Sequence, residues 1–199
     1  MKTEKVQIIA CGALAREIRS VIEANGLLHL AVTCLPAIWH NHPERIVPGV
    51  DNAIATARRE GFSKIFVAYG DCGTGGALDR LLEHEQVDRL PGPHCYAFFA
   101  GTDRFAANAE EDMRAFFLTD FLARQFHAFV VKPLGLDRHP ELRGLYFQHY
   151  EKLVYLAQSD DDTLDQAARE AATFLDLAYE RRFTGYGDLT GSLLATAQI

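Results

Sequence analysis

The stretch VQIIACGALAREIRSVIEANG, residues 6–26, decides the fold. Its apolar run over residues 6–10 predicts a buried strand that stops at the pair Cys11 and Gly12. Residues 13–24 predict a helix, because their apolar side chains recur on one helical face, and residues 25–26, Asn-Gly, are typical of a helix C-terminus. The chain therefore opens with a strand followed at once by a helix.

The same alternation continues outward through the first hundred residues. Strands are predicted over 28–35, 64–69 and 95–100, and helices over 51–60 and 77–85. Residues 38–50 contain too many helix breakers for one element and predict a long loop. This order predicts an α/β fold of Rossmann-like type, with a mainly parallel sheet of about five strands and helices on both faces.

The second half of the chain is predicted to be more helical. Apolar residues over 102–131 recur at helical spacing and favour one bent helix or two, and a Phe-rich part, 105–129, suits a core or a subunit interface. Further elements are expected in the order helix around Leu145, strand 152–158, helix 164–177 and strand 179–184, before a loose polar tail. Since no repeat or linker marks a boundary, we expect a single α/β domain over residues 1–199.

Composition and charge narrow the function. The chain has 27 acidic and 20 basic residues, a net charge of −7, which disfavours nucleic acid and anionic membranes as main partners. No apolar stretch approaches the ~20 residues that span a bilayer, and the N-terminus lacks the pattern of a signal peptide. Four cysteines are too few for a disulfide scaffold. We therefore expect a cytoplasmic protein with free thiols.

Three of the cysteines are expected at one edge of the sheet. Cys11 follows the first strand, Cys34 lies near the end of the second and Cys72 follows the third, whereas Cys95 opens a predicted strand and would lie at the opposite edge. A helix N-terminus after Cys11 and after Cys72 would stabilise a thiolate. Cys34, inside an apolar run, is expected to be a buried structural residue.

These residues allow several kinds of chemistry. Three thiolates suit an iron–sulfur cluster with one open iron, and the same three with His40 suit zinc, although no CxxC or HExxH spacing is present and His40 also fits an exposed loop. A thiol enzyme with Cys72 or Cys11 as nucleophile is a further alternative. The metal hypothesis thus competes with a catalytic thiol and with plain structural roles.

The glycine-rich turn GDCGTGG, residues 70–76, precedes a predicted helix. Its backbone N–H groups could hold an anionic cofactor with Gly73, Thr74, Gly75 and Asp71 as binding residues, although the turn matches neither the P-loop nor the GxGxxG pattern. The alternative is a tight turn between strand and helix, in which Asp71 stabilises the turn.

Six motifs together resemble a family of bacterial and archaeal proteins of unknown function whose genes often lie near corrinoid-dependent methyltransferases. The motifs are CGALAREI at 11–18, LPAIWHNHPERI at 35–46, YGDCGTGG at 69–76, HCY at 94–96, LGLDRHPEL at 134–142 and YLAQ at 155–158.

The resemblance implies that Cys11, Cys72 and Cys95 function together and makes His40, Asp71 and the loop 137–139 candidates for the site. It also implies a role in corrinoid or one-carbon methyl transfer, with a corrinoid as a further cofactor. A corrinoid protein or a methyltransferase is the implied partner. The alternative is a non-catalytic accessory protein that binds such a partner through its Phe-rich helices, and a homo-oligomer would also suit these helices.

Overall fold

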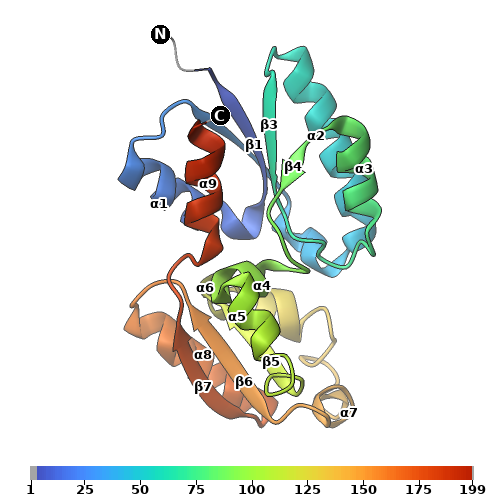
Figure 1. The fold of residues 1–199 in the computed structure, drawn as a ribbon. Coiled ribbons are helices and arrows are strands. Elements are labelled where there is room, and N and C mark those ends of the chain that lie inside the picture. The colour runs from blue at the N-terminus through green and yellow to red at the C-terminus, as the bar shows by residue number, and fades with distance from the viewer. Residues whose placement is uncertain (1–3, 199) are drawn as a thin grey trace. The chain divides into compact units, whose positions relative to one another are not determined.

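A computed structural model describes residues 4–198, which form two compact α/β units (Figure 1). Of the described residues, 4–98 and 186–198 belong to unit 1, and 99–185 belong to unit 2. Both sheets are parallel, which confirms the α/β, Rossmann-like class. The strands are divided between a sheet of four and a sheet of three, where the sequence predicted one sheet of about five. The single domain over residues 1–199 stays a prediction.

The sheet of unit 1 has the strand order β2-β1-β3-β4. Its strands are β1 (Val6–Cys11), β2 (Leu30–Leu35), β3 (Lys64–Ala68) and the short β4 (Asp88–Arg89). β1 is central, and Ile8, Ile9 and Ala10 are fully buried, as expected for a strand covered on both faces. β2 is an edge strand, and three of its six residues, Val32, Thr33 and Cys34, are exposed.

Helices cover both faces of this sheet (Figure 1). On one face α2 (Ile46–Arg59) and α3 (Ala77–Glu85) pack on β1 and β3, in a core that includes Ile9, Ile54 and Tyr69. On the other face α1 (Ala15–Asn25) packs against α9 (Asp188–Gln198). The short 3-10 helices of the connections are η1 (Gly12–Leu14), η2 (Ala37–Asn41) and η3 (Pro43–Arg45).

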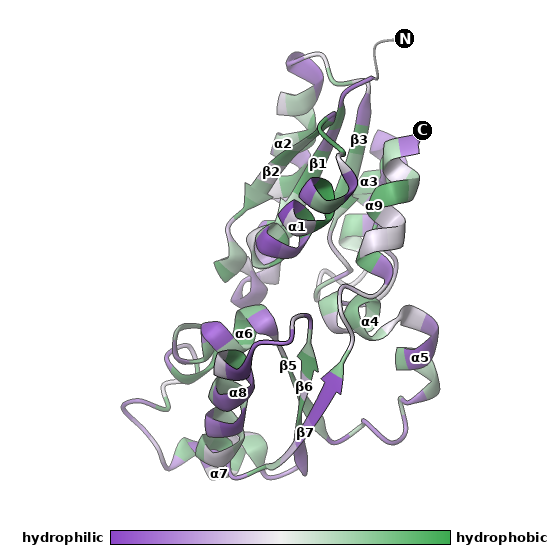
Figure 2. Ribbon diagram, turned by 90° about the vertical axis from the view of Figure 1, so that its left-hand side faces the viewer, coloured by the Kyte–Doolittle hydropathy of each residue, from purple (hydrophilic) through white to green (hydrophobic). Residues whose placement is uncertain are grey.

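Unit 2 has the strand order β5-β6-β7. The central strand β6 (Lys152–Ala157) is buried along most of its length, between β5 (Ala115–Thr119) and the largely hydrophilic edge strand β7 (Ala178–Phe183) (Figure 2). α8 (Asp162–Leu175) packs on β6, β7 and α6. The remaining helical segments are α5 (Thr102–Ala107), α6 (Asp120–Arg124), the π-helical η4 (His127–Val131) and α7 (Leu142–Phe147).

The strand predicted over residues 95–100 is wrong: this segment is the helix α4 (Cys95–Ala100). A six-residue apolar run fits a buried strand and one buried face of a short helix equally well, so its periodicity does not separate them. The boundary between the two units falls inside α4, after Phe98. Cys95 is the first residue of this helix, so the reason for expecting it at the opposite edge of the sheet, its place at the start of a strand, does not apply.

The long helical stretch predicted over residues 102–131 is also wrong, because β5 lies inside it. The segment AFFLT, residues 115–119, is rich in aromatic residues, which favour strands. Thr119 then starts α6, since its hydroxyl accepts a hydrogen bond from the Leu122 N–H at 3.4 Å. The phenylalanines that recur at helical spacing are thus divided between the strand β5 and the three short helical segments α5, α6 and η4.

Two further segments are more helical than predicted. The loop expected over residues 38–50 already contains the first turn of α2, where Pro48 is tolerated because N–H groups in a first turn have no partner within the helix. The tail expected to be loose forms α9, held by Leu189 and Leu193, which are fully buried. Within residues 4–198 no helix has the length and hydropathy needed to cross a membrane.

Candidate functional site

Cys11, Cys72 and Cys95 lie near one another at the carboxyl end of the sheet in unit 1. Cys11 ends β1, Cys72 lies in the turn after β3 and Cys95 begins α4; all three are half-buried. Burial raises the pKa of each thiol, that of Cys72 to about 12. Cys11 raises the pKa of Cys72 further, and both raise that of Cys95, so the three sulfurs are within electrostatic range.

The turn after β3 holds Cys72 in an unusual backbone conformation. Cys72 has a φ of +50°, in the left-handed region that side chains other than glycine rarely adopt, and Gly73 follows with a φ of +84°. Such strain persists only where the surrounding contacts impose it and is often found at functional sites. The position of Cys72 is therefore set by its loop.

Asp71 organises the glycine-rich turn from within. Its carboxylate accepts hydrogen bonds from the Thr74 hydroxyl at 2.6 Å and from the N–H groups of Gly76 at 2.8 Å and Gly75 at 3.2 Å. The bond from Thr74 and those from the two glycines hold the pKa of Asp71 below its usual value. In this structure the Thr74 hydroxyl and the two glycine N–H groups therefore bind the carboxylate of Asp71. That Gly73, Thr74, Gly75 and Asp71 bind an anionic cofactor stays a prediction.

A second loop, residues 90–94, brings Cys95 to Cys72. The Asp71 N–H donates to the Gly92 carbonyl at 3.1 Å, and the Cys72 N–H donates to the Pro93 carbonyl at 2.7 Å. Arg89, paired with Asp79 at 2.6 Å, also donates to the Leu90 carbonyl at 2.6 Å. The two loops are thus joined by their backbones immediately before Cys95.

Tyr69 places a buried hydroxyl beside the thiols. It follows β3, is 2% exposed, and has no hydrogen-bond partner of normal geometry for its hydroxyl among residues 4–198. Burial raises the pKa of Tyr69, and Cys11 raises it further; in return the hydroxyl lowers the pKa of Cys11. The Tyr69 hydroxyl is therefore close to the Cys11 sulfur. Sequence reasoning missed this residue, although a tyrosine that ends an apolar strand directly before the glycine-rich turn was a usable signal.

Two histidines lie at this end of the unit. His40, in η2, is exposed, and His94 directly precedes Cys95. Partial desolvation lowers the pKa of both imidazoles, and His40 further lowers that of His94. His94 was not among the residues assigned to the site from the sequence.

The prediction of a buried Cys34 is wrong. Cys34 is exposed, because it lies in the exposed stretch 32–34 of the edge strand β2. Cys34 pairs in register with Ala10, next to Cys11, and its thiol raises the pKa of Cys11 after the larger effect of burial. It therefore borders the group of three cysteines.

The arrangement is not a ready-made metal site. Within residues 4–198 no three or more His, Cys, Asp or Glu side chains stand in metal-binding geometry. Side-chain rotations would have to draw the sulfurs together around an ion. The loop 137–139 lies in unit 2, where the exposed His139 Nδ1 lies 3.2 Å from the Glu141 carboxylate.

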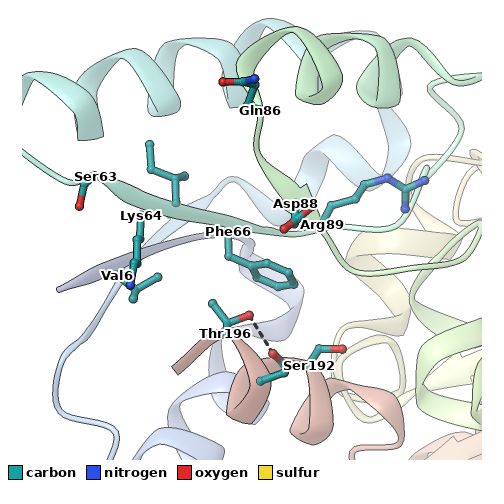
Figure 3. A pocket seen from close by; sticks show the side chains of 11 residues that line it. Val6, Ser63, Lys64, Phe66, Gln86, Asp88, Arg89, Ser192 and Thr196 are labelled. Carbon is teal, nitrogen blue, oxygen red and sulfur yellow. Dashed lines mark hydrogen bonds between the residues drawn. The ribbon is translucent and has the colours of Figure 1, made fainter. Parts of the chain in front are cut away.

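Unit 1 also has cavities away from the cysteines. One of about 270 Å³ is lined by residues of β2, η2 and α2, including Thr33, Trp39 and Asn52. Another, of about 400 Å³, lies beside α9 and is lined by Phe66 of β3 and by Ser192 and Thr196 of α9 (Figure 3). Neither lining includes a cysteine.

Fold and site define the class: an α/β protein with Rossmann-like parallel sheets and thiols gathered at the carboxyl end of one of them. The model of the family described as "Protein of unknown function (DUF1638)" matches residues 34–193, and the chain belongs to this family. Cys72, Cys95 and His40 fall inside the match, and Cys11 precedes it. No curated protein and no solved structure matches the chain.

Proposed function

We propose that Cys11, Cys72 and Cys95 hold a metal centre, either zinc or an iron–sulfur cluster, with His40 as the fourth ligand. The observation that carries the proposal is the gathering of three half-buried thiols: Cys11 and Cys72 pack against one core cluster, and both raise the pKa of Cys95. Burying three ionisable thiols together is unfavourable for an anion, and a bound cation offsets that cost. Thiolates are the ligands that zinc and iron–sulfur clusters prefer.

The residues of the site have distinct roles in this proposal. The joined loops set the positions of Cys72 and Cys95, while Cys11 is fixed by the end of the central strand. A zinc ion held by the three cysteines and His40 would have all four positions filled, whereas a cluster held by the three cysteines alone would leave one iron open. A reducing cytoplasm, where we place the protein, would keep the thiols available.

Metal analysis of anaerobically purified protein tests the proposal. We expect about one zinc per chain, or iron with acid-labile sulfide and visible absorption, in the wild type or after reconstitution. Cys72→Ser and Cys95→Ser should lose most of the metal, because each removes a ligand. Cys34→Ser is the matched control and should retain it. Wild-type protein that takes up neither zinc nor a cluster would overturn the proposal, and loss of metal in Cys34→Ser would overturn the ligand set.

The same observation disfavours the alternative of a thiol enzyme. A nucleophilic cysteine needs a lowered pKa, whereas burial raises the pKa of Cys72 to about 12. We expect Cys72 in the metal-free protein to react with iodoacetamide only at alkaline pH. Rapid alkylation at pH 7 would favour the thiol enzyme over the metal centre.

A partner in corrinoid-linked methyl transfer forms the second part of the proposal. Unit 2 exposes large apolar side chains on α7, with Leu145 61% and Tyr146 43% exposed, beside the ring cluster of Phe116, Phe147 and Tyr150. Exposed apolar groups of this kind are frequent where proteins meet. Co-purification with a corrinoid protein or methyltransferase encoded nearby tests this. We expect Leu145→Asp to abolish the association; no association of the wild-type protein would contradict it.

A further inference from the structure

We infer that Tyr69 is a positioning residue of the proposed metal centre, whose hydroxyl donates a hydrogen bond to the Cys11 sulfur once that sulfur binds a metal. The inference rests on the proposed function. It starts from the Tyr69 hydroxyl, which is fully buried and has no partner of normal geometry among residues 4–198. Buried hydroxyl groups are nearly always hydrogen-bonded, so one without a partner needs an explanation.

The surroundings of Tyr69 indicate which acceptor the hydroxyl serves. Its ring belongs to the core cluster of unit 1 that also contains Val67 and Leu78, and this packing fixes the direction of the phenol. Cys11 and Cys72 pack against the same core, and the hydroxyl interacts with the Cys11 sulfur. The sulfur of a cysteine is therefore the neighbouring group that the hydroxyl can reach.

The state of the sulfur decides how good an acceptor it is. A thiol is a weak acceptor, whereas a metal-bound cysteine is a thiolate, and hydrogen bonds to charged acceptors are roughly twice as strong as those between neutral groups. Metal binding therefore converts an unsatisfied hydroxyl into a satisfied one. Partners of this kind, one step removed from the metal, typically change metal affinity 10–100-fold.

This role predicts opposite effects in the two states of the protein. In Tyr69→Phe only the hydroxyl is lost. Without metal, the variant should be as resistant to urea as the wild type or more so, because removing an unsatisfied buried polar group is neutral or stabilising. The dissociation constant of the metal should be roughly tenfold higher or more in Tyr69→Phe than in the wild type. A purely structural tyrosine would lower the urea midpoint and leave metal affinity alone.

The chain offers a matched control in Tyr155. This tyrosine is also fully buried, but it lies in unit 2 and its hydroxyl donates to Asp120 at 2.7 Å. Tyr155→Phe should therefore lower the urea midpoint of the metal-free protein and leave metal affinity within twofold of the wild type. The two substitutions remove the same atom from equally buried positions.

The experiment uses Co²⁺ as a spectroscopic probe of a mononuclear site, or ferrous iron and sulfide if the wild type takes up a cluster. We expect the sulfur-to-metal absorption band to shift in Tyr69→Phe, and to shift in the opposite direction with 3-fluorotyrosine at position 69, whose more acidic hydroxyl is a better donor. Unchanged affinity and bands in both variants would overturn the role of Tyr69. Failure of the wild type to take up either metal would overturn the proposed function instead.

Discussion

Gly70 shows how a single missing side chain brings the two cysteine-bearing loops together. A Cβ atom at this position would lie 2.9 Å from both the Cα and the N of His94, and 3.1 Å from the Gly92 carbonyl oxygen. All three are backbone atoms, so no side-chain rotation can relieve the contact. The close approach of residues 70–72 to residues 92–94 therefore requires glycine at position 70.

We expect Gly70→Ala to lower the free energy of unfolding by about 1–3 kcal/mol, because overpacking of this kind forces backbone shifts. It should also weaken metal binding, since the loops would separate. Gly144→Ala is the control: a Cβ there meets nothing within 4 Å, and alanine in α7 favours the helix by up to about 1 kcal/mol. Urea unfolding measures both, and equal stabilities of Gly70→Ala and wild type would contradict the packing argument.

At the residue scale the sequence led to part of the site. Cys11 and Cys72 could be placed because each follows a predicted strand of a parallel sheet, where loops meet at one edge. The burial of Cys34 could not be judged, since an apolar run does not reveal whether its strand is central or at an edge. Tyr69 escaped notice because a tyrosine is an ordinary core residue until its hydroxyl is found without a partner.

Asp176 illustrates how helix ends are built in this protein. It caps the C-terminus of α8 with a φ of +61°, a conformation in which glycine is normally preferred. The Asp176 N–H donates to the Thr173 carbonyl at 3.2 Å, so the geometry of the cap is satisfied. What remains is the conformational cost of a side chain in the left-handed region.

Asp176→Gly should therefore raise the free energy of unfolding by about 0.5–1 kcal/mol. The control places the same residue inside the same helix: Glu170→Gly, at an exposed position of α8, should lower it by about 1 kcal/mol. Thermal and urea unfolding check the signs. Destabilisation by both substitutions would show that the aspartate side chain stabilises this cap.

At the scale of elements, the prediction succeeded for segments whose hydrophobic pattern fits only one type of secondary structure. α1, α3 and β6 match their predicted ranges within two residues, because each has a clear period and a clear stop such as Asn25-Gly26. α4 and β5 were missed because short aromatic runs suit both strand and helix. Because β5 was missed, the prediction also missed that the strands form two sheets, since β5 is the first strand of the second sheet.

At the scale of whole units, a network of charges joins the strands of unit 2. Arg182 on β7 donates to both Asp112 oxygens, at 2.5 and 2.8 Å, and to Glu180 at 2.5 Å. Lys152 on β6 pairs with Asp112 at 3.2 Å and Glu180 at 2.9 Å. Burial alone would raise the pKa of Asp112, but Arg182 and Lys152 hold it below its usual value. The pKa of Glu180 is also lowered, mainly by its hydrogen bond from Arg182. Burial has a smaller, opposite effect, and Lys152 lowers this pKa further.

These lowered pKa values make unit 2 sensitive to acid. A carboxyl whose pKa is lower in the folded state contributes stability above its unfolded pKa, about 4, and loses it as pH falls through the folded pKa. We expect Arg182→Gln to lower the free energy of unfolding at pH 7 by about 1–3 kcal/mol and to reduce the loss between pH 7 and pH 3. Urea unfolding across this range measures both.

Arg114→Gln is the control for this network. Arg114 pairs with Glu151 where both side chains are more than half exposed, and such surface pairs contribute at most about 1 kcal/mol. Its pH profile should follow that of the wild type. A wild-type profile for Arg182→Gln as well would mean that the network does not couple the stability of unit 2 to protonation.

Unit 1 is built from two segments of the chain, one before and one after unit 2, and this order has a consequence for biosynthesis. α9, which packs on α1 and buries Leu189 and Leu193, is encoded after the whole of unit 2. At ~5–20 residues per second, a ribosome needs on the order of ten seconds to make unit 2. During that interval Cys11, Cys72 and Cys95 have already been translated, while the apolar surface that α9 will cover has no partner. This nascent stage is when unit 1 most needs a chaperone.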